Sequence, residues 1–330
     1  MAEVNPLLIG AIFISSAAIA AFSLPILIRK FIAAGMMGND VNKAGKYPVA
    51  EMGGLAIVMG AIGSLLLAIA LYTFFGYSFN LVSMLAAMLT LMIIALIGTY
   101  DDLFDMRQSI KAVLPMAAAL PLVAVSAAGS TEISLPFLGT MDFGYFYIVL
   151  LIPLGVAVAS NLTNMLAGFN GMEAGMGCVI FATTLFLGLI QGSTEMAMIS
   201  AAMLGALLIF LRFNWYPARV FTGDIGNLSI GAALAVAVIL GNLESAGAIL
   251  VIPYVLDFFI KAKNRFPSTK WWGELKGGKL YPLEGKVRGA AQLVMKLSGG
   301  ITEQKLVLVF IAAEALCALV AIALFGRVLG

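Results

Sequence analysis

Uninterrupted apolar runs dominate this sequence, and each is about long enough to cross a lipid bilayer as a single helix. A bilayer-spanning helix needs about 20 apolar residues, with a working range of roughly 17 to 25. Continuous rather than alternating apolar residues favour helices over a transmembrane barrel. The chain is therefore expected to be an all-α, polytopic integral membrane protein in which residues 1–330 form one catalytic domain. We predict ten spans, at residues 4–28, 53–75, 81–99, 110–128, 144–160, 172–190, 195–211, 228–243, 246–260 and 305–325.

Composition supports the membrane class and narrows the chemistry. Hydrophobic residues make up 62% of the 330 residues and charged residues 11%, whereas a soluble domain has roughly half and a quarter. A formal net charge of +2 is too small for a nucleic-acid-binding protein. Histidine is absent, which excludes imidazole catalysis and leaves carboxylates, amides, lysines and arginines. Cys178 and Cys317 lie inside apolar runs, without the spacing of a metal or redox motif.

Basic residues predict the orientation, because Lys and Arg gather in cytoplasmic loops. All of the 19 basic residues except Lys305 and Arg327 follow an odd-numbered run. We therefore expect both termini outside and five loops on the cytoplasmic face, in a plasma membrane or, in a eukaryote, the endoplasmic reticulum. The first run should be a retained helix rather than a signal peptide, because Arg29 and Lys30 follow it instead of preceding it.

Three features outside regular spans are predicted as well. The outer loop 129–142 has β-branched residues on either side of a Pro and a Gly, which indicates a small hairpin. No other strand is expected. Pro253 should kink the ninth run. Residues 261–304 mix basic residues and glycines with Trp271 and Trp272, which is typical of an inner substrate loop at the membrane surface.

The first polar cluster lies at the inner end of the third run. Asp101 and Asp102 are adjacent, so on a helix their side chains point about 100° apart and should have different roles. Lys111 lies just inside the fourth run, where an ammonium is costly unless an anion compensates it. The alternative is a solvated helix end with mixed charges.

The second cluster is the segment 161–175, which reads NLTNMLAGFNGMEAG and follows the fifth run. Asn161 and Asn164 are one helical turn apart. Gly168 permits a tight turn, and the amide of Asn170 is free to contact a polar ligand. The alternative is a turn whose asparagines only cap the two neighbouring helices.

Two further elements lie before the eighth and second runs. Residues 216–227 hold a single acid, Asp224, and Phe221 offers an aromatic face for stacking. Asp224 would also serve as an ordinary helix N-cap. A shorter element places Lys46 and Glu51 at the mouth of the second run.

All four clusters fall on the predicted inner side, where their carboxylates and amides suit Mg²⁺ and their basic groups suit phosphate. Together they resemble the polyprenyl-phosphate N-acetylhexosamine-1-phosphate transferases. In that family a DD pair follows the third helix, an NxxNxLAGxNGxEAG segment follows the fifth, and an FxGD element precedes the eighth. All three occur here in that order, and the ten-span topology matches along the chain. The wording LAGFNGMEAG at 166–175 resembles the eukaryotic and archaeal branch more than the bacterial muramoyl-pentapeptide branch.

The resemblance implies a reaction, in which N-acetylglucosamine-1-phosphate moves from UDP-N-acetylglucosamine to a polyprenyl phosphate of the dolichyl type and UMP is released. This would be the first lipid-linked step of glycan assembly. It implies Mg²⁺, with Mn²⁺ as an alternative, held by Asp224 and Asn164, and it makes Asp101, Asp102 and Lys111 catalytic. The substrate-binding residues that it implies are Phe221, Gly168, Asn170, Asn161, Glu51, Lys46, Arg265 and Arg288. A homodimer is left open.

One departure from the family is clear. Relatives usually carry a histidine-containing basic motif in the last inner loop, whereas this chain has no histidine. One of five basic residues must therefore take over that work: Lys263, Arg265, Lys279, Lys286 or Arg288. For this reason Arg265 and Arg288 are among the predicted substrate-binding residues.

Two alternatives remain at this point. One is a bacterial-type undecaprenyl-phosphate transferase that uses a different nucleotide sugar. The other is an ion-coupled transporter, favoured by the acids Asp257 and Glu314 inside the ninth and tenth runs. Against a transporter, the acids, amides and glycines gather at one membrane face rather than at the midplane.

Overall fold

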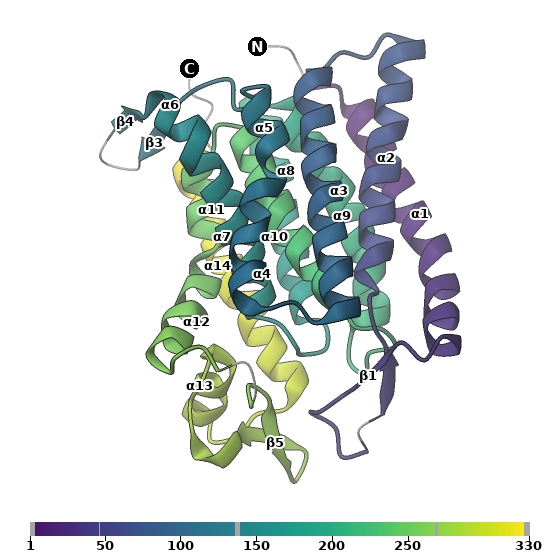
Figure 1. The fold of residues 1–330 in the computed structure, drawn as a ribbon, viewed down its shortest axis with the longest axis vertical. Helices are drawn as coiled ribbons and strands as arrows, with labels where there is room; N and C mark the ends of the chain where they lie inside the picture. The colour runs from purple at the N-terminus through teal and green to yellow at the C-terminus, as the bar shows by residue number, and fades with distance from the viewer. Residues whose placement is uncertain (1–3, 46, 136–138, 268–269, 327–330) are drawn as a thin grey trace.

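The computed structural model describes residues 4–45, 47–135, 139–267 and 270–326, and it is a bundle of helices with three small two-stranded sheets (Figure 1). The predicted all-α, polytopic membrane class is confirmed. Large apolar side chains such as Leu7, Phe22 and Phe74 point outward from the bundle, which fits contact with lipid tails.

Eight continuous spans are long and apolar enough to cross a bilayer within the described residues. One of them, Gly144–Met165, consists of α6 (Gly144–Phe146), a π-helical turn (Tyr147–Leu151) and α7 (Ile152–Met165). The eight are α1 (Pro6–Ala33), α2 (Gly54–Phe75), α3 (Leu81–Phe104), Gly144–Met165, α8 (Met172–Gln191), α9 (Thr194–Asn214), α10 (Gly223–Leu240) and α14 (Glu303–Phe325).

The ninth predicted span is a bent pair. Helices α11 (Glu244–Leu250) and α12 (Ile252–Lys263) meet at 58°, and Pro253 lies in the first turn of α12. Because proline has no N–H to donate, the break falls just before it, and the predicted kink is confirmed.

The fourth predicted span, 110–128, is wrong in its bounds. The structure has a short helix α4 (Gln108–Ala118) and a single turn α5 (Leu120–Ala124), separated at Ala119. Pro121 begins α5 and cannot donate a hydrogen bond back into α4, so one straight helix does not form. Ten spans are therefore an approximation to eight long helices, one bent pair and one short broken segment.

The outer hairpin is confirmed as β3 (Glu132–Leu135) and β4 (Gly139–Asp142), which pair antiparallel. The expectation of no other strand is wrong. Two further strand pairs form, and their strands are only three or four residues long, too short to show an alternating pattern in the sequence. The additional pairs are β1 (Met37–Asn39) with β2 (Pro48–Ala50), and β5 (Gly273–Lys276) with β6 (Lys279–Pro282).

Helix α10 is the centre of the bundle. It packs against α2, α3, α7, α8 and α9, and 83% of its residues are buried, more than in any other span. Two glycines permit the close approach at its N-terminus. A Cβ on Gly98 of α3 would lie 2.4 Å from Ile225 Cα, and one on Gly223 would lie 2.8 Å from the Asp102 carboxylate. The first turn of α10 is therefore held tightly against α3.

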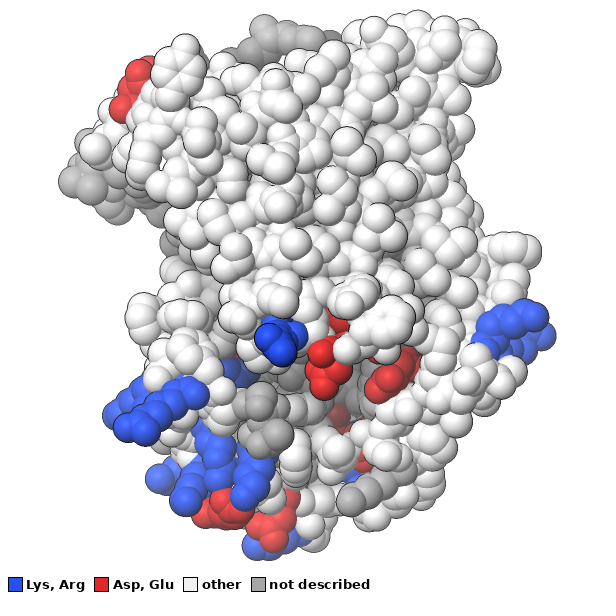
Figure 2. Space-filling view, in the orientation of Figure 1, with Lys and Arg blue, Asp and Glu red and all other residues white. Residues whose placement is uncertain are grey.

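The two ends of the bundle differ in charge. Both termini and the hairpin β3–β4 lie at one end, and β1, β5, α12 and α13 (Ala290–Leu297) lie at the other (Figure 1). On the face shown in Figure 2, Lys and Arg gather at the end with α12, α13 and β5. We call this the basic end. The basic residues that follow the odd-numbered runs in the sequence thus gather at one end of the folded bundle.

Gly98→Ala is expected to lower the free energy of unfolding by about 1–3 kcal/mol, because the new methyl group would overlap backbone atoms of α10. Gly155→Ala is the matched control, since a Cβ on Gly155 of α7 meets nothing within 4 Å. Thermal unfolding in detergent compares the two variants. Equal stability of both variants would contradict the close packing of α3 on α10.

Candidate active site

A large cavity opens at the basic end and measures about 1230 Å³. Pockets for one drug-sized ligand usually measure roughly 300–1,000 Å³, so this cavity has room for more than one. We call it the main cavity. Its walls come from residues 38–42, α4, α7, the turn 167–170, residues 221–224 and α12.

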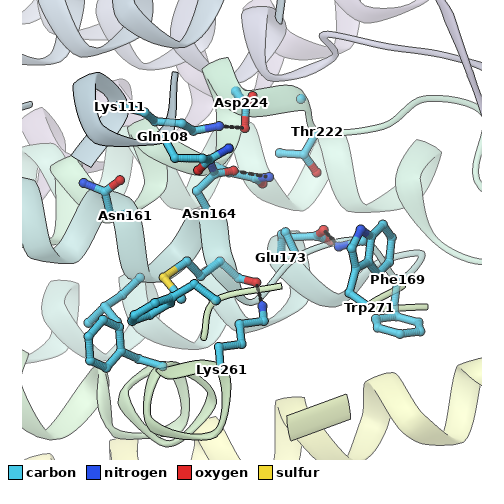
Figure 3. Close-up of a pocket in the computed structure, with 18 of the residues that line it drawn as sticks. Gln108, Lys111, Asn161, Asn164, Phe169, Glu173, Thr222, Asp224, Lys261 and Trp271 are labelled. Carbon is cyan, nitrogen blue, oxygen red and sulfur yellow. Dashed lines mark hydrogen bonds and ion pairs between the residues drawn. The ribbon is translucent and has the colours of Figure 1, made fainter. Parts of the chain in front are cut away.

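An ammonium between two carboxylates forms one polar wall, and Figure 3 shows its contact with one of them, Asp224. Lys111 of α4 pairs with Asp101 of α3, and its Nζ lies 2.9 Å from Asp224 Oδ1 on α10. Asp101 also accepts a 2.7 Å hydrogen bond from the Met106 backbone N–H. Lys111 and Asp224 line the main cavity, whereas Asp101 is buried behind them. Two carboxylates, Asp101 and Asp224, thus compensate the charge of the Lys111 ammonium.

Asp102 has a different task from its neighbour. Its two carboxylate oxygens accept hydrogen bonds from the Asp224 and Ile225 backbone N–H groups, at 2.7 and 3.0 Å. These N–H groups belong to the first turn of α10, where no intrahelical partner exists and a negative charge is favourable. Asp102 therefore caps α10 from another helix, and the predicted divergence of the two acids is observed.

Amide groups continue the wall beside Asp224. Asn227 Nδ2 donates to Asn164 Oδ1 at 3.2 Å, and the buried Oδ1 of Asn227 has no hydrogen-bond partner among the described residues. Asn161, one turn before Asn164, donates to the Ala157 carbonyl at 2.8 Å and lines the main cavity. Both predicted asparagines on α7 are therefore at the cavity wall.

A second, smaller cavity of about 540 Å³ lies next to the first. Asp101 and Asp102 line it, and the two cavities share Glu51, Phe221 and Asp224 among their walls. Burial and, secondly, the nearby Asp224 carboxylate raise the pKa of Glu51. Because Phe221 lines both cavities, it lies on the wall between them.

The glycine turn of the second cluster packs on an aromatic side chain of the last inner loop (Figure 3). A Cβ on Gly168, whose φ is +111°, would lie 2.3 Å from the Trp271 ring, so the turn needs glycine there. Phe169 meets Trp271 edge-on at 5.9 Å between ring centroids. The buried Glu173 accepts a hydrogen bond from the Gly168 N–H. The turn is thus rigid.

The opposite part of the main cavity is apolar. Leu154 and Val158 of α7 and Phe259 of α12 line it while remaining exposed on the outside of the bundle. The cavity therefore continues onto the surface that faces lipid tails. The other apolar residues of this part are Met116, Ala157, Leu162, Met165, Val255 and Phe258.

Asp257, one of the two acids that favoured a transporter, is bound by two neighbouring groups of the protein. It pairs with Lys261 at 2.7 Å and accepts a 2.7 Å hydrogen bond from the Ala290 N–H at the start of α13. Lys261 also donates to the Met165 carbonyl. Glu314 is fully buried in α14 and has no hydrogen-bond partner. Asp257 thus caps a helix and gives no support to an ion pathway.

Two predicted substrate-binding residues, Arg265 and Arg288, are not at either cavity, and the place of a third is not described. Lys46 lies outside the described residues. Arg265 is exposed just after α12, and Arg288 pairs with Glu284 at 2.5 Å and donates to the Leu283 carbonyl at 3.2 Å. Neither arginine lines either cavity. Hydrogen bonds from Lys270 and then Arg288 lower the pKa of Glu284 to about 2.

Sequence reasoning missed a charged cluster around Asn170, of which only Asp40 lines the main cavity. Asp40 and Lys43 come from the first inner loop and Glu303 from the start of α14. Lys43 pairs with Asp40 at 3.1 Å and with Glu303. All three are distant in the sequence from Asn170, so spacing alone could not find them. The one available signal was the Asp and Lys three residues apart in a loop.

The donor set beside Asn164 was tested for a divalent cation. Mg²⁺ in proteins typically uses one or two carboxylates, waters and substrate phosphates rather than a full protein cage. No group of three or more acidic or thiol side chains within the described part of the chain could hold a metal alone. The Asp224 carboxylate, Asn164 Oδ1 and the unpaired Asn227 Oδ1 are hard oxygen donors on one wall. This set fits a cation that phosphate oxygens complete.

Comparison with known families gives one match. A profile described as glycosyl transferase family 4 matches residues 84–242, which include both carboxylates of α3, the segment 161–175 and Asp224.

Comparison with individual proteins extends over nearly the whole chain. A Saccharolobus solfataricus protein, provisionally named UDP-N-acetylglucosamine–dolichyl-phosphate N-acetylglucosaminephosphotransferase, is 36% identical over 93% of this chain and 97% of its own length. The enzyme of that name from Dictyostelium discoideum is 28% identical, over 87% of this chain and 81% of its own. A phospho-N-acetylmuramoyl-pentapeptide-transferase from Halalkalibacterium halodurans is 30% identical, over 66% of this chain and 72% of its own length.

Asp102→Asn is expected to lower the free energy of unfolding by about 1–3 kcal/mol, because an amide offers one acceptor atom and no charge to the two N–H groups of α10. Asp105→Asn is the control. Asp105 is exposed in the left-handed region at the end of α3, a conformation that Asn tolerates. Thermal unfolding that affected both variants equally would refute the capping role of Asp102.

Proposed function

This chain belongs to glycosyl transferase family 4, and from that premise we propose that it transfers N-acetylglucosamine-1-phosphate from UDP-N-acetylglucosamine to a dolichyl-type polyprenyl phosphate. The observation that carries the proposal is the main cavity, which joins a polar wall to an apolar part open to the lipid-facing surface. One water-soluble and one lipid-soluble substrate can meet only in a cavity with both surfaces.

The nucleotide sugar occupies the part of the main cavity near the turn 167–170. Gly168 and Asn170 line it, together with Phe221 on the shared wall. Glu51 and Asn161 also line the main cavity, and we assign them to the sugar and the diphosphate. The roles of these residues are carried over from the family resemblance, and the cavity lining supports them.

The diphosphate lies against Lys111, Asp224 and Asn164. Asp224 and Asn164 hold Mg²⁺, which neutralises the diphosphate charge when it is bound. Lys111 directs its ammonium at the same space and neutralises phosphate charge as well. Asp101 keeps that ammonium in place, and Asp102 keeps Asp224 in place by holding the first turn of α10.

In the reaction an oxygen of the lipid phosphate attacks the β-phosphorus of the nucleotide sugar. The new P–O bond forms while the bond between the β-phosphorus and the bridging oxygen breaks, and UMP leaves with that electron pair. The polyprenyl chain lies along Leu154, Val158 and Phe259, between α7 and α12. Its phosphate then reaches the wall of Lys111, whose ammonium Asp101 holds from the side of the smaller cavity.

The reaction is tested by UMP release from UDP-N-acetylglucosamine with purified full-length protein. Release is expected only when Mg²⁺ and a polyprenyl phosphate are both present. Asp224→Asn should reduce turnover by at least about 100-fold, because it removes charge from the transition-state site, while the fold is retained. Release of UMP without any lipid phosphate, or selective use of UDP-N-acetylmuramoyl-pentapeptide, would contradict the proposal.

We propose that the basic end faces the cytoplasm, because basic residues favour that side. Glu132 in the hairpin β3–β4 and Lys276 in β5 are both exposed and lie at opposite ends of the bundle. With Cys178 and Cys317 replaced by Ser, Glu132→Cys should react with an impermeant thiol reagent in intact cells. Lys276→Cys should react only after permeabilisation. The reverse pattern would invert the orientation.

A further inference from the structure

Asn170 is held by a closed ring of side chains from three distant segments. Its Nδ2 donates to Asp40 Oδ2 at 2.9 Å, and its backbone N–H donates to Glu303 Oε1 at 2.9 Å. Lys43 closes the ring by pairing with both Asp40 and Glu303, and it lies 4.2 Å above the centre of the Tyr216 ring. Asp40, Asn170 and Glu303 are all buried.

The ring determines which way round the Asn170 amide lies. A carboxylate can only accept hydrogen bonds, so the group facing Asp40 must be the NH₂ of Asn170 and not its oxygen. The same carboxylate pairs with the Lys43 ammonium at 3.1 Å, so Asp40 accepts from Lys43 and from Asn170. The amide oxygen, Oδ1, therefore points away from Asp40.

Oδ1 is the group that Asn170 can offer to a ligand. No hydrogen bond to it occurs among the described residues, whereas the Nδ2 and the backbone N–H of Asn170 are both paired. Asn170 and Asp40 both line the main cavity, in the part near Trp271. A hydrogen-bond acceptor of fixed orientation selects a ligand edge that donates at that position.

We propose that the Asp40–Lys43–Glu303 ring is a positioning device that makes Asn170 select the N3–H of uracil over the unprotonated N3 of cytosine. The inference rests on the proposed function, because a uracil nucleotide is its premise. Uracil carries its single ring N–H donor next to two carbonyls at N3, whereas cytosine presents a lone pair there. With Oδ1 fixed, the uracil edge is satisfied and the cytosine edge meets acceptor against acceptor.

Asp40→Asn distinguishes this positioning role from a purely structural one, in which the ring only holds the three segments together. An amide at position 40 presents either an oxygen or an NH₂ to Asn170, so the Asn170 amide is no longer forced into one orientation. Side-chain size is preserved, and Lys43 keeps Glu303 as a partner. Glu274→Gln is the matched control, because Glu274 is a partly exposed carboxylate at the same end that pairs with Lys276 and lines neither cavity.

The measurement is calorimetric binding of UMP and of CMP to the full chain with Mg²⁺ and no lipid acceptor. Wild-type protein and Glu274→Gln should bind UMP at least about tenfold more tightly than CMP, as for one mismatched buried hydrogen bond. In Asp40→Asn the ratio should fall to within about threefold. Turnover should show a raised KM for the nucleotide sugar with little change in kcat, because the ring does not touch the reacting phosphorus.

Each other outcome has a distinct meaning. Binding of neither nucleotide by wild-type protein contradicts the proposed function itself. Tight UMP binding with an unchanged ratio in Asp40→Asn overturns the positioning role alone, as does equal binding of both nucleotides by wild-type protein. If Asp40→Asn does not fold, Asn170→Ala decides. This variant removes Oδ1, so a retained preference for UMP would overturn the inference.

Discussion

The ammonium of Lys111 between Asp101 and Asp224 is the interaction on which the rest of the site depends. Three charges this deeply placed at a membrane edge would be costly one by one, and they are tolerated because each has an opposite charge within hydrogen-bond reach. To meet, they need three helices at close distance. The glycine on α3 and the glycine before Asp224 permit that distance, and Asp102 keeps it by capping α10. The close packing of α3 on α10 and the charge chemistry of the wall therefore require each other.

Broken helices give this charged wall its access to lipid. A bundle of straight spans would close its apolar faces against one another and leave a site open only to water. Here α4 ends early, and α11 and α12 bend by 58°. Exposed side chains of α7 and α12 line the cavity between these elements. Prolines in α4, α5 and α12 remove the N–H groups that a continuous helix would use. The same local chemistry thus shapes both the fold and the route for a hydrophobic substrate.

Sequence alone predicted the parts that depend on local patterns: the long spans, the hairpin β3–β4, the kink at Pro253 and the different directions of Asp101 and Asp102. It could not predict partners set by tertiary packing. The capping of α10 by Asp102 joins residues on two helices, and the contact of Asp40 with Asn170 joins two loops that no spacing relates. Arg265 and Arg288 were chosen for charge, but charge does not say which basic side chain turns inward. Lys261 and Trp271 of the same region line the main cavity instead.

The balance of charge on the polar wall also says what the wall can accept. Around Lys111 stand the carboxylates Asp101, Asp102 and Asp224, with Glu51 beside them, so the protein groups there are negative in sum. A diphosphate and a lipid phosphate are negative too, and at distances of a few ångströms like charges in a partly desolvated site repel strongly. One ammonium cannot offset both substrates and the surrounding acids. With the proposed substrates the wall would be complementary to phosphate only together with a further cation, for which the oxygens of Asp224, Asn164 and Asn227 would be the ligands. An acid-rich wall around a single lysine is thus a consequence of bringing two anions together, since the acids hold in place the positive charge that the reaction needs.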